Sequence, residues 1–143
     1  MSQISENVWL GSILEASNFQ WLKSKGITHI LNVAYEIPNF FSNYFVYKKL
    51  PLDDSLSQDI KPALILSYVF IDNVLRRGGK IFIHCHAGIS RSSSMLIHYL
   101  MRKYGITYDN AKIYVRQRRN IIRPNPYFQY QLKNINVAKV EAN

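Results

Sequence analysis

The feature of this sequence that most constrains its fold is an apolar run that leads into the chain's only cysteine and then into a short loop. The run is Ile81–Ile83, the cysteine is Cys85, and Gly88 lies between that cysteine and Arg91. A continuous apolar run predicts a strand that is buried on both faces, as in a parallel sheet. A strand followed by a tight loop and a helix leaves backbone N–H groups free to bind an anion at the helix N-terminus. The chain is therefore expected to fold around a thiol beside an anion site.

Strands and helices are predicted to alternate along most of the 143 residues. Runs rich in β-branched and aromatic residues indicate strands, and apolar residues at helical spacing before a glycine indicate helices. Ser17 is the predicted N-cap of the first helix. Strands are predicted at 7–10, 28–33, 44–50 and 80–84, and helices at 17–25, 58–76, 90–104, 108–118 and 126–137. This order predicts one α/β domain over residues 1–143, with a central, mostly parallel, twisted sheet of about five strands flanked by helices.

The charge of the chain favours anionic partners. Lysine and arginine outnumber the acids and give a formal net charge of +9, which suits phosphate esters, phosphoproteins, nucleic acid or an acidic membrane surface. Part of this charge gathers in one segment, at Arg116, Arg118, Arg119 and Arg123. These arginines are predicted either to form a solvated helix face or to guide a substrate, and the sequence does not choose between the two.

The location of the protein is predicted from its single cysteine and its N-terminus. One cysteine excludes an internal disulfide and a four-cysteine metal site, and it fits a reducing compartment. Residues 1–6 lack the basic and apolar pattern of a signal peptide. No apolar run approaches the roughly eighteen residues that a membrane span needs. A cytoplasmic location is expected, and the nucleus is a further candidate location.

The residues after Cys85 are suited to holding a small anion. Gly88 permits the close approach and the unusual dihedral angles that a tight loop requires. Arg91 offers a planar fork that can bind two phosphate oxygens. This positive environment is expected to favour the thiolate form of Cys85, which is the attacking form, and Ser92 can donate a hydrogen bond to the sulfur or cap the following helix. The predicted phosphate-binding residues are His86, Ala87, Gly88, Ile89, Ser90 and Arg91.

Other readings of the cysteine are weaker. His84, Cys85 and His86 could suggest a metal site, but alternate residues of a strand point to opposite sides and no second ligand cluster follows. A cysteine protease would need a histidine base, and nothing marks His29 or His98 for that role. A buried, inert cysteine is disfavoured by the glycine and arginine downstream. The sequence predicts no metal and no cofactor.

Displacing an alkoxide or a phenoxide from phosphorus also needs a general acid. Asp53 and Asp54 lie in a polar loop after the predicted 44–50 strand and are the candidates. Both could instead be turn or capping residues. Asp59 is a further option, although its place at the start of the next helix is typical of a residue that stabilises a helix N-terminus.

The motif His84-Cys85-x2-Gly88-x2-Arg91-Ser92 resembles the signature of the protein tyrosine phosphatases. The fuller form, His-Cys-x-Ala-Gly-x-Ser-Arg-Ser, is similar to that of the dual-specificity branch. Three further segments resemble that branch, and the similarity covers roughly residues 4 to 135. These segments are 10–12, 26–33 and 123–128.

The resemblance implies a mechanism in which Cys85 attacks phosphorus and forms a phosphocysteine while Arg91 and the loop amides hold the phosphoryl oxygens. In similar proteins the acid lies about seventeen residues before the isoleucine of a Phe-Ile-Asp helix motif, which here is Ile71 and selects Asp54 over Asp53. The resemblance also implies that Asn125 braces the loop, although an Asn-Pro turn explains that residue equally well. His84 resembles a histidine that supports the thiolate indirectly.

The expected function is hydrolysis of phosphotyrosine, phosphoserine and phosphothreonine in proteins by a small, catalytic-domain-only member of this family. The loop lacks the lysines that the phosphoinositide branch carries. It also lacks the Gly-Arg-Thr-Gly ending of the tyrosine-only enzymes, and the chain is shorter than their catalytic domain. The alternatives are a non-protein substrate (an RNA 5′ end, a glucan or a phosphoinositide) and a phosphate-recognising module with little activity. Phosphoproteins are the expected partners, nucleic acid is disfavoured, and the sequence does not determine an oligomeric state.

Overall fold

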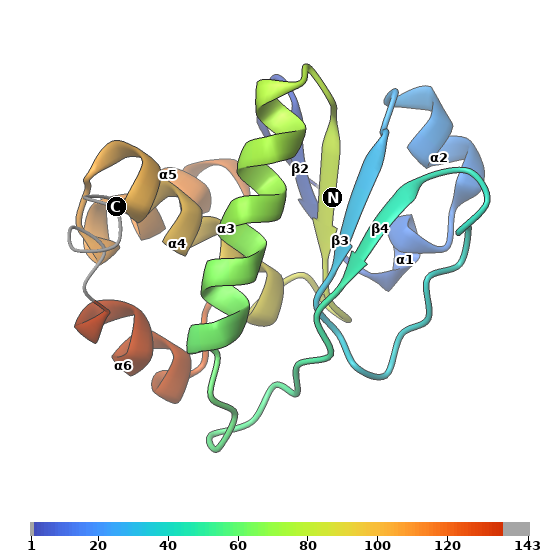
Figure 1. The fold of residues 1–143 in the computed structure, drawn as a ribbon. Coiled ribbons are helices and arrows are strands. Elements are labelled where there is room, and N and C mark those ends of the chain that lie inside the picture. Colours follow the sequence, from blue (N-terminus) through green and yellow to red (C-terminus); the bar gives the residue numbers. More distant parts are fainter. Residues whose placement is uncertain (1, 136–143) are drawn as a thin grey trace.

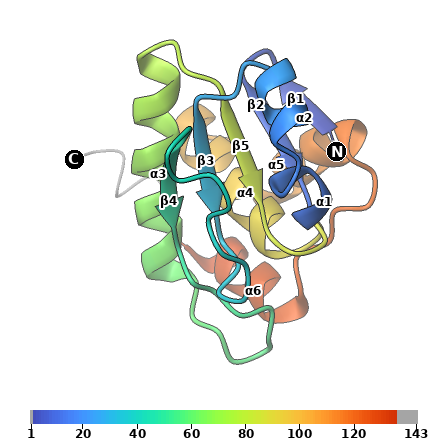
Figure 2. The same cartoon turned by 90° about the vertical axis from the view of Figure 1, so that its right-hand side faces the viewer.

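A five-stranded sheet in the order β1-β2-β5-β3-β4 lies at the centre of the protein (Figure 1). The computed structural model describes residues 2–135. The strands are β1 (Ser2–Ser5), β2 (Val8–Gly11), β3 (His29–Asn32), β4 (Val46–Lys49) and β5 (Ile81–His84). The helices are α1 (Ile13–Ala16), α2 (Phe19–Ser24), α3 (Lys61–Arg76), α4 (Arg91–Tyr104), α5 (Tyr108–Arg118) and α6 (Pro126–Asn134). Helices α1 and α2 cover one face of the sheet, and α3 to α6 lie on the other (Figures 1 and 2).

The predicted fold class is confirmed. β5 is the middle strand and pairs in parallel with β2 and β3, and β4 continues the sheet in parallel beyond β3. Only the β1–β2 pair is antiparallel among the described strands. Strand β1 was not predicted, because Ile4 is its one apolar residue and a single apolar residue does not indicate a strand. In the structure Ile4 is buried in the core.

The predicted helix over 17–25 is wrong in its extent and its cap. Helix α2 occupies only residues 19–24 of this segment. The unpredicted helix α1 comes directly before it, and Ser17 is the C-cap of α1 rather than an N-cap. Ser12 caps α1 and forms a reciprocal capping box with Glu15, as the pattern Ser-x-x-Glu favours. The side chain of Asn18 then accepts from the Trp21 N–H and begins α2. Two separate caps define two helix starts, so the chain turns between them.

Two other helix bounds differ from the prediction. α3 begins at Lys61 rather than at residue 58, because Gln131 on α6 binds the preceding backbone: its amide accepts from the Ile60 N–H and donates to the Gln58 carbonyl. α6 ends at Asn134, and residues 136 and 137 of the predicted helix lie outside the described residues. α5 spans 108–118 as predicted.

The side chains of β5 alternate between two cores. Ile81 and Ile83 join the large core beneath α3 to α6, whereas Phe82 joins the smaller core beneath α1 and α2, where its ring lies 5.3 Å from that of Trp21. A strand buried on both faces explains the continuous apolar run. β5 is thereby fixed in position, and the residue that follows His84 emerges at the carboxyl edge of the parallel strands.

Helix α4 runs through the large core and carries polar residues that are buried. His98 is fully buried, and its Nε2 accepts from Arg102 Nε at 3.1 Å, so the ring is neutral. Burial, with a smaller contribution from Arg102, lowers the pKa of His98 to about 3. Within residues 2–135, no helix is long and apolar enough to cross a membrane.

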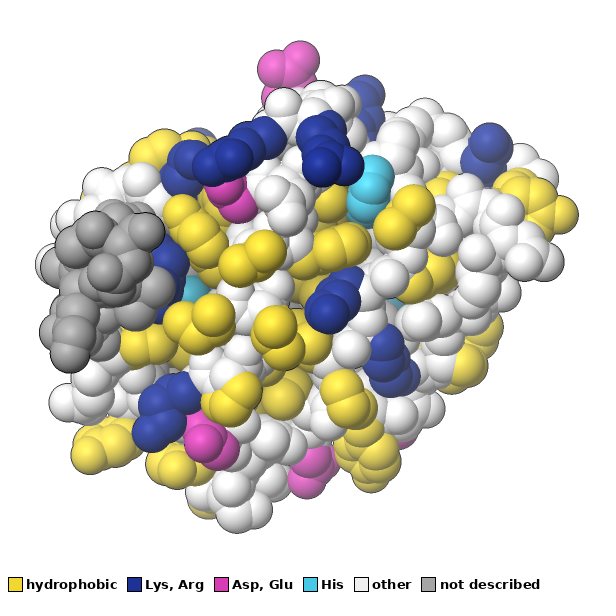
Figure 3. All heavy atoms as spheres, viewed as in Figure 1, with side chains coloured by type: hydrophobic (Ala, Val, Ile, Leu, Met, Phe, Trp, Pro, Cys, Tyr) yellow, Lys and Arg dark blue, Asp and Glu magenta, His cyan; other side chains and the backbone are white. Residues whose placement is uncertain are grey.

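Figure 3 shows the face formed by α3 and the edge of the sheet. Lysine and arginine side chains occupy separate groups on this face, with hydrophobic side chains between them. Part of the apolar surface comes from α3, where Ile65, Leu66 and Val69 are exposed. The basic charge of the chain therefore does not form one continuous surface on this side.

We expect the fold to lose stability between pH 7 and pH 5. Burial lowers the pKa of His84 to about 4 and that of His98 to about 3, against about 6.5 in an unfolded chain. As the pH falls from 7 to 5, these histidines therefore become protonated in the unfolded state before they do so in the folded state. The free energy of unfolding should fall by about 2 kcal/mol per histidine over this interval. Urea unfolding at both pH values measures the loss.

The variant His98→Gln should reduce this pH-dependent loss by about 2 kcal/mol, because one titrating group is removed. His86→Gln is the matched control, since His86 is exposed, and its loss should equal that of the parent. An equal loss in the parent and in His98→Gln would contradict the prediction.

Candidate active site

Cys85 follows directly after β5 and lies at the carboxyl edge of the sheet. Its side chain is buried, at 2% exposure, and Sγ lies 3.2 Å from the Oγ of Ser92 in the first turn of α4. The Val33 N–H donates to the His84 carbonyl at 3.0 Å and the Ile13 N–H donates to the His86 carbonyl at 2.8 Å. The backbone on either side of the thiol is thus fixed by the connections that follow β2 and β3.

The carbonyl groups of the Cys85 loop, residues 85–91, bond outward. The Arg119 guanidinium donates to the Gly88 carbonyl at 2.9 Å and to the Ala87 carbonyl at 3.2 Å. The Arg123 N–H donates to the Ile89 carbonyl at 2.7 Å. In a trans peptide the carbonyl and the N–H of one unit point in opposite directions. The amide N–H groups at residues 88–90 therefore face away from these donors, on the side where an anion can bind.

Gly88 is required by close approach as well as by conformation. Its φ is +69°, and a Cβ at this position would lie 2.6 Å from the Gly11 carbonyl oxygen and 2.7 Å from Arg119 Nη2. The Gly11 backbone and the hydrogen-bonded Arg119 guanidinium therefore leave no room for a larger residue. These distances support the expectation that the loop needs a glycine at position 88. One of the two neighbours, Gly11, belongs to β2, and its closeness could not be inferred from spacing within the loop.

Arg91 contacts an acidic residue that sequence analysis missed. Its guanidinium forms a bidentate pair with Glu36, at 2.6 Å from Nη1 to Oε1 and 2.7 Å from Nη2 to Oε2, and Nη1 also donates to the Leu52 carbonyl. The hydrogen bonds from Arg91 lower the pKa of Glu36 to about 2, against an opposing effect of burial. Glu36 is therefore a carboxylate at neutral pH and occupies the fork that would bind an anion.

The structure brings Asp54 to the same pocket and leaves Asp53 out of its lining. Asp54 lines the pocket with Cys85, and its Oδ1 accepts from Asn125 Nδ2 at 2.9 Å. The Asp53 backbone instead bonds to Gln58. Asp59 accepts from the Lys61 N–H at the start of α3, as a helix N-terminal residue does.

Asn125 connects the acidic loop to the Cys85 loop. Its side chain donates to Asp54 and to the Ser55 carbonyl, and its N–H donates to Ser90 Oγ at 3.0 Å. Its Oδ1 also caps α6 by accepting from the Phe128 N–H. The two readings of Asn125, a brace and a turn residue, are therefore combined in one side chain.

His84 lies beneath the loop rather than in the pocket. It is 1% exposed, and its Nδ1 lies 3.2 Å from the Cys85 carbonyl. Burial lowers its pKa to about 4, although the bond to that carbonyl acts in the opposite direction. A neutral imidazole next to the cysteine backbone can orient the thiol without adding charge. His86, by contrast, is exposed and lines the pocket.

The site pocket has a volume of about 330 Å³. It contains a nucleophilic thiol, two carboxylates and one guanidinium, together with the loop backbone. The lining residues are Glu36, Asp54, Cys85, His86, Ala87, Ile89, Ser90 and Arg91. Among the described residues no group of three or more histidine, cysteine or acidic side chains could hold a metal ion.

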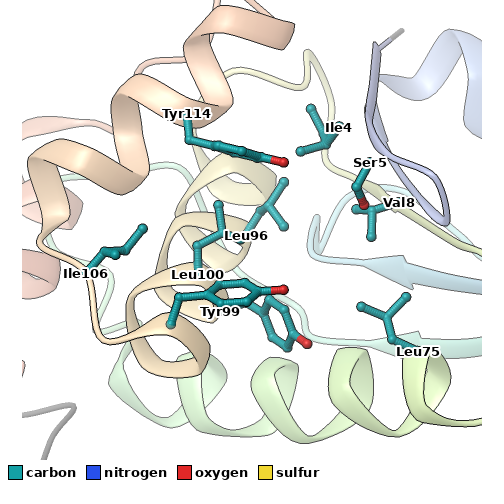
Figure 4. A pocket seen from close by; sticks show the side chains of 10 residues that line it. Ile4, Ser5, Val8, Leu75, Leu96, Tyr99, Leu100, Ile106 and Tyr114 are labelled. Carbon is teal, nitrogen blue, oxygen red and sulfur yellow. The ribbon is translucent and has the colours of Figure 1, made fainter.

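A second pocket of similar volume, about 330 Å³, lies between β1, α3, α4 and α5 (Figure 4). Leu96, Leu100 and Ile106 contribute apolar walls, and the tyrosine rings of Tyr99 and Tyr114 lie across it. It contains no carboxylate, imidazole or thiol. The pocket at Cys85, which contains such groups, is therefore the candidate active site.

A buried thiol at the end of a central parallel strand, followed by an amide-lined loop and an arginine at the start of a helix, defines a cysteine-dependent phosphate site on an α/β fold. The model of the family "Dual specificity phosphatase, catalytic domain" matches residues 8–138. This chain belongs to that family.

Known relatives resemble this chain over most of its length. Human protein phosphatase Slingshot homolog 2 is 41% identical over 132 residues, which are 92% of this chain and 9% of that protein. Dual specificity protein phosphatase 1-A of Xenopus laevis is 43% identical over 125 residues, covering 87% and 34% of the two chains. The chain thus spans about a third or less of these curated relatives. The crystal structure of the human tyrosine phosphatase-like serine/threonine/tyrosine-interacting protein is similar, with a TM-score of 0.86, 34% identity and coverage of 99% and 95%.

We expect Glu36→Gln to tighten anion binding, because the carboxylate competes with an anion for Arg91. A neutral amide forms the weaker hydrogen bond, so the dissociation constant for inorganic phosphate should fall by about threefold to tenfold. Calorimetry on the Cys85→Ser protein with and without the Glu36 change, at pH 7.5, measures this.

Glu6→Gln is the matched control for the loss of one negative charge. Glu6 lies in the turn between β1 and β2, at the opposite end of β2 from the site, and its substitution should leave the constant unchanged. Unchanged or weaker phosphate binding in Glu36→Gln would show that Glu36 does not compete.

Proposed function

We propose that this protein hydrolyses phosphate monoesters on proteins and accepts phosphotyrosine, phosphoserine and phosphothreonine. The observation that carries the proposal is the common pocket of Cys85, Arg91 and Asp54 at the amide-lined loop. Membership of the family supports it, as do relatives whose names describe dual specificity protein phosphatases.

The first step is attack of the Cys85 thiolate on phosphorus. An S–P bond forms as the P–O bond to the leaving group breaks, and Asp54 donates its proton to the departing oxygen. The loop amides and Arg91 bind the equatorial oxygens, where negative charge must be stabilised. For Arg91 to do so, the phosphoryl group must share or displace the Glu36 carboxylate.

The second step hydrolyses the phosphocysteine. Asp54, now a carboxylate, takes a proton from water, the water oxygen bonds to phosphorus, and the S–P bond breaks to release phosphate and the Cys85 thiolate. Ser92 Oγ lies 3.2 Å from Sγ and can donate a hydrogen bond that stabilises the leaving sulfur. Asn125 holds Asp54 toward the pocket. These steps require no metal and no cofactor.

We further propose that residues 1–143 form one catalytic domain that acts in the cytoplasm, with the nucleus as a further candidate location. The family match over most of the chain supports the first part. The need for a free Cys85 thiol supports a reducing compartment. Phosphoproteins are the proposed partners.

The alternative is a phosphate-recognising module with little turnover, which one observation favours: the Arg91 fork is already paired with Glu36. A similar solved structure bears the name of a phosphatase-like interacting protein. Turnover of an aryl phosphate that disappears in Cys85→Ser separates the alternatives. A panel of phosphotyrosine, phosphothreonine and phosphoserine peptides, with a phosphoinositide and an RNA 5′-triphosphate, defines the substrate class.

We expect Asp54→Asn to lower kcat on a phosphotyrosine peptide by about a hundredfold or more, as loss of a general acid does. Asp53→Asn is the matched control, because Asp53 is the neighbouring acid and does not line the pocket; its kcat should change less than about threefold. Steady-state phosphate release measures both. Greater loss in Asp53→Asn than in Asp54→Asn would overturn the assignment.

A further inference from the structure

Four basic side chains gather where α5 meets α6 and the segment between them. We call Lys112, Arg116, Arg123 and Lys133 the α5–α6 basic cluster. Lys112 and Arg116 are four residues apart on α5, so they share one face of that helix. The Nζ atoms of Lys112 and Lys133 lie 5.7 Å and 5.5 Å from the centre of the Tyr108 ring. Lys133 on α6 therefore meets Lys112 on α5 across one aromatic ring.

The cluster is not neutralised by acids of the described chain. No ion pair within residues 2–135 involves any of its four members. Burial lowers the pKa of Lys112, and repulsion from Arg116 and Lys133 lowers it further; Asp109 opposes these effects. Like charges held together in this way are unfavourable, and an anion between them would relieve the repulsion.

A buried hydroxyl group accompanies the cluster. Tyr108 is 5% exposed, and its hydroxyl has no hydrogen-bond partner among the described residues. Burial raises the pKa of Tyr108 to about 12, so the group remains a donor. Unsatisfied buried donors are uncommon. The hydroxyl oxygen is buried, so the ring is the part of Tyr108 that the two lysines approach.

The cluster differs from the basic segment that the sequence suggested. Arg119 is buried against the Cys85 loop. Arg118 lies over the Tyr114 ring at 3.7 Å and donates to the Tyr114 carbonyl. Arg116 and Arg123 remain exposed, and the structure adds two lysines to them. Four arginines in one stretch of sequence are thus divided between three different surroundings.

The cluster begins beside the active site. The Arg123 N–H donates to the Ile89 carbonyl of the Cys85 loop, and Asn125 at the start of α6 binds Asp54. From there α6 reaches Lys133 in about 10 to 12 Å. An extended peptide advances about 3.3 Å per residue, so the length of α6 alone corresponds to about three to four residues. The path from Cys85 past Ser90 to Asn125 adds to this length, so a span of about four to six residues joins the pocket to the cluster.

We propose that the α5–α6 basic cluster binds an acidic or phosphorylated segment of a protein substrate, four to six residues from the phosphoresidue held at Cys85. The inference rests on the proposed phosphatase function and names its substrate class. Surface ion pairs contribute little singly, but several cations facing one segment add selectivity among substrates.

Two phosphotyrosine peptides of equal length test the proposal. In the acidic peptide, three consecutive glutamates are centred five residues before the phosphotyrosine and three more are centred five residues after it. In the other peptide, alanines replace all of these glutamates. In the variant Lys112→Glu/Lys133→Glu, the ratio of kcat/KM for the acidic peptide to that for the alanine peptide should fall about fivefold to tenfold. The change should lie in KM. Lys112→Gln/Lys133→Gln, which removes charge without reversing it, should give a smaller fall in the same direction.

Lys23→Glu/Lys25→Glu is the matched control, with the same change in net charge. These lysines lie at the end of α2, close in sequence to Thr28, whose N–H donates to the Lys80 carbonyl at the amino edge of the sheet. Cys85 lies at the opposite, carboxyl edge. The control should leave the ratio unchanged, and thermal melts should show that both charge variants are folded. Equal ratios in the parent and the cluster variant would overturn the proposal. Loss of single-stranded RNA binding in that variant, with the peptide ratio unchanged, would also overturn it.

A binding measurement separates this proposal from the proposed function. Fluorescence anisotropy of the labelled acidic peptide with the Cys85→Ser protein needs no turnover. An absence of aryl phosphate hydrolysis by the parent would overturn the catalytic proposal alone, whereas acidic and alanine peptides that bind equally to the Cys85→Ser protein would overturn the role of the cluster.

Discussion

The site depends on hydrogen bonds that pull the carbonyl groups of the Cys85 loop outward. Peptide groups between a strand and a helix could turn either way, and a loop with inward carbonyls would repel an anion. The buried Arg119 guanidinium binds two of these carbonyls, and Gly88 leaves the space that this approach needs. The amides, the helix start and Arg91 then face one pocket with Cys85. Arg119 binds the loop from the side opposite the pocket and thereby leaves the amide N–H groups, which carry partial positive charge, facing the anion site.

The positive charge of the pocket is balanced by two carboxylates with different surroundings. Glu36 is bound bidentately to Arg91, which lowers its pKa to about 2. Asp54 accepts a hydrogen bond from the amide of Asn125, and Arg91 acts on it electrostatically without forming an ion pair among the described residues. A carboxylate bound to a cation resists protonation, whereas a general acid must carry a proton. This difference supports Glu36 as the competitor for Arg91 and is consistent with the proposal that Asp54 is the general acid.

The loop itself could be predicted from sequence because its chemistry is local. Cys85, Gly88, Arg91 and Ser92 lie within eight residues, and a strand, a loop and a helix start suffice to place them. The choice of Asp54 required a family resemblance, since nothing local separates it from Asp53. Helix α1 could have been predicted, because the Ser12–Glu15 capping box at its start is a local sequence pattern. Ser17 is the C-cap of α1, so it is not the start of the next helix.

Other parts could not be predicted, because they depend on which strands become neighbours. Glu36 contacts Arg91 across 55 positions, and Arg119 contacts the loop across 31 and 32. Nothing in a single sequence distinguishes those charged residues from solvated ones. The basic cluster likewise forms only when α6 packs beside α5. The sequence by itself determined the layered fold and the candidate nucleophile and anion loop that we propose, since local periodicity and spacing encode them. Tertiary structure alone decided which charges meet, because long-range pairing follows from the burial of apolar faces and not from the charged residues themselves.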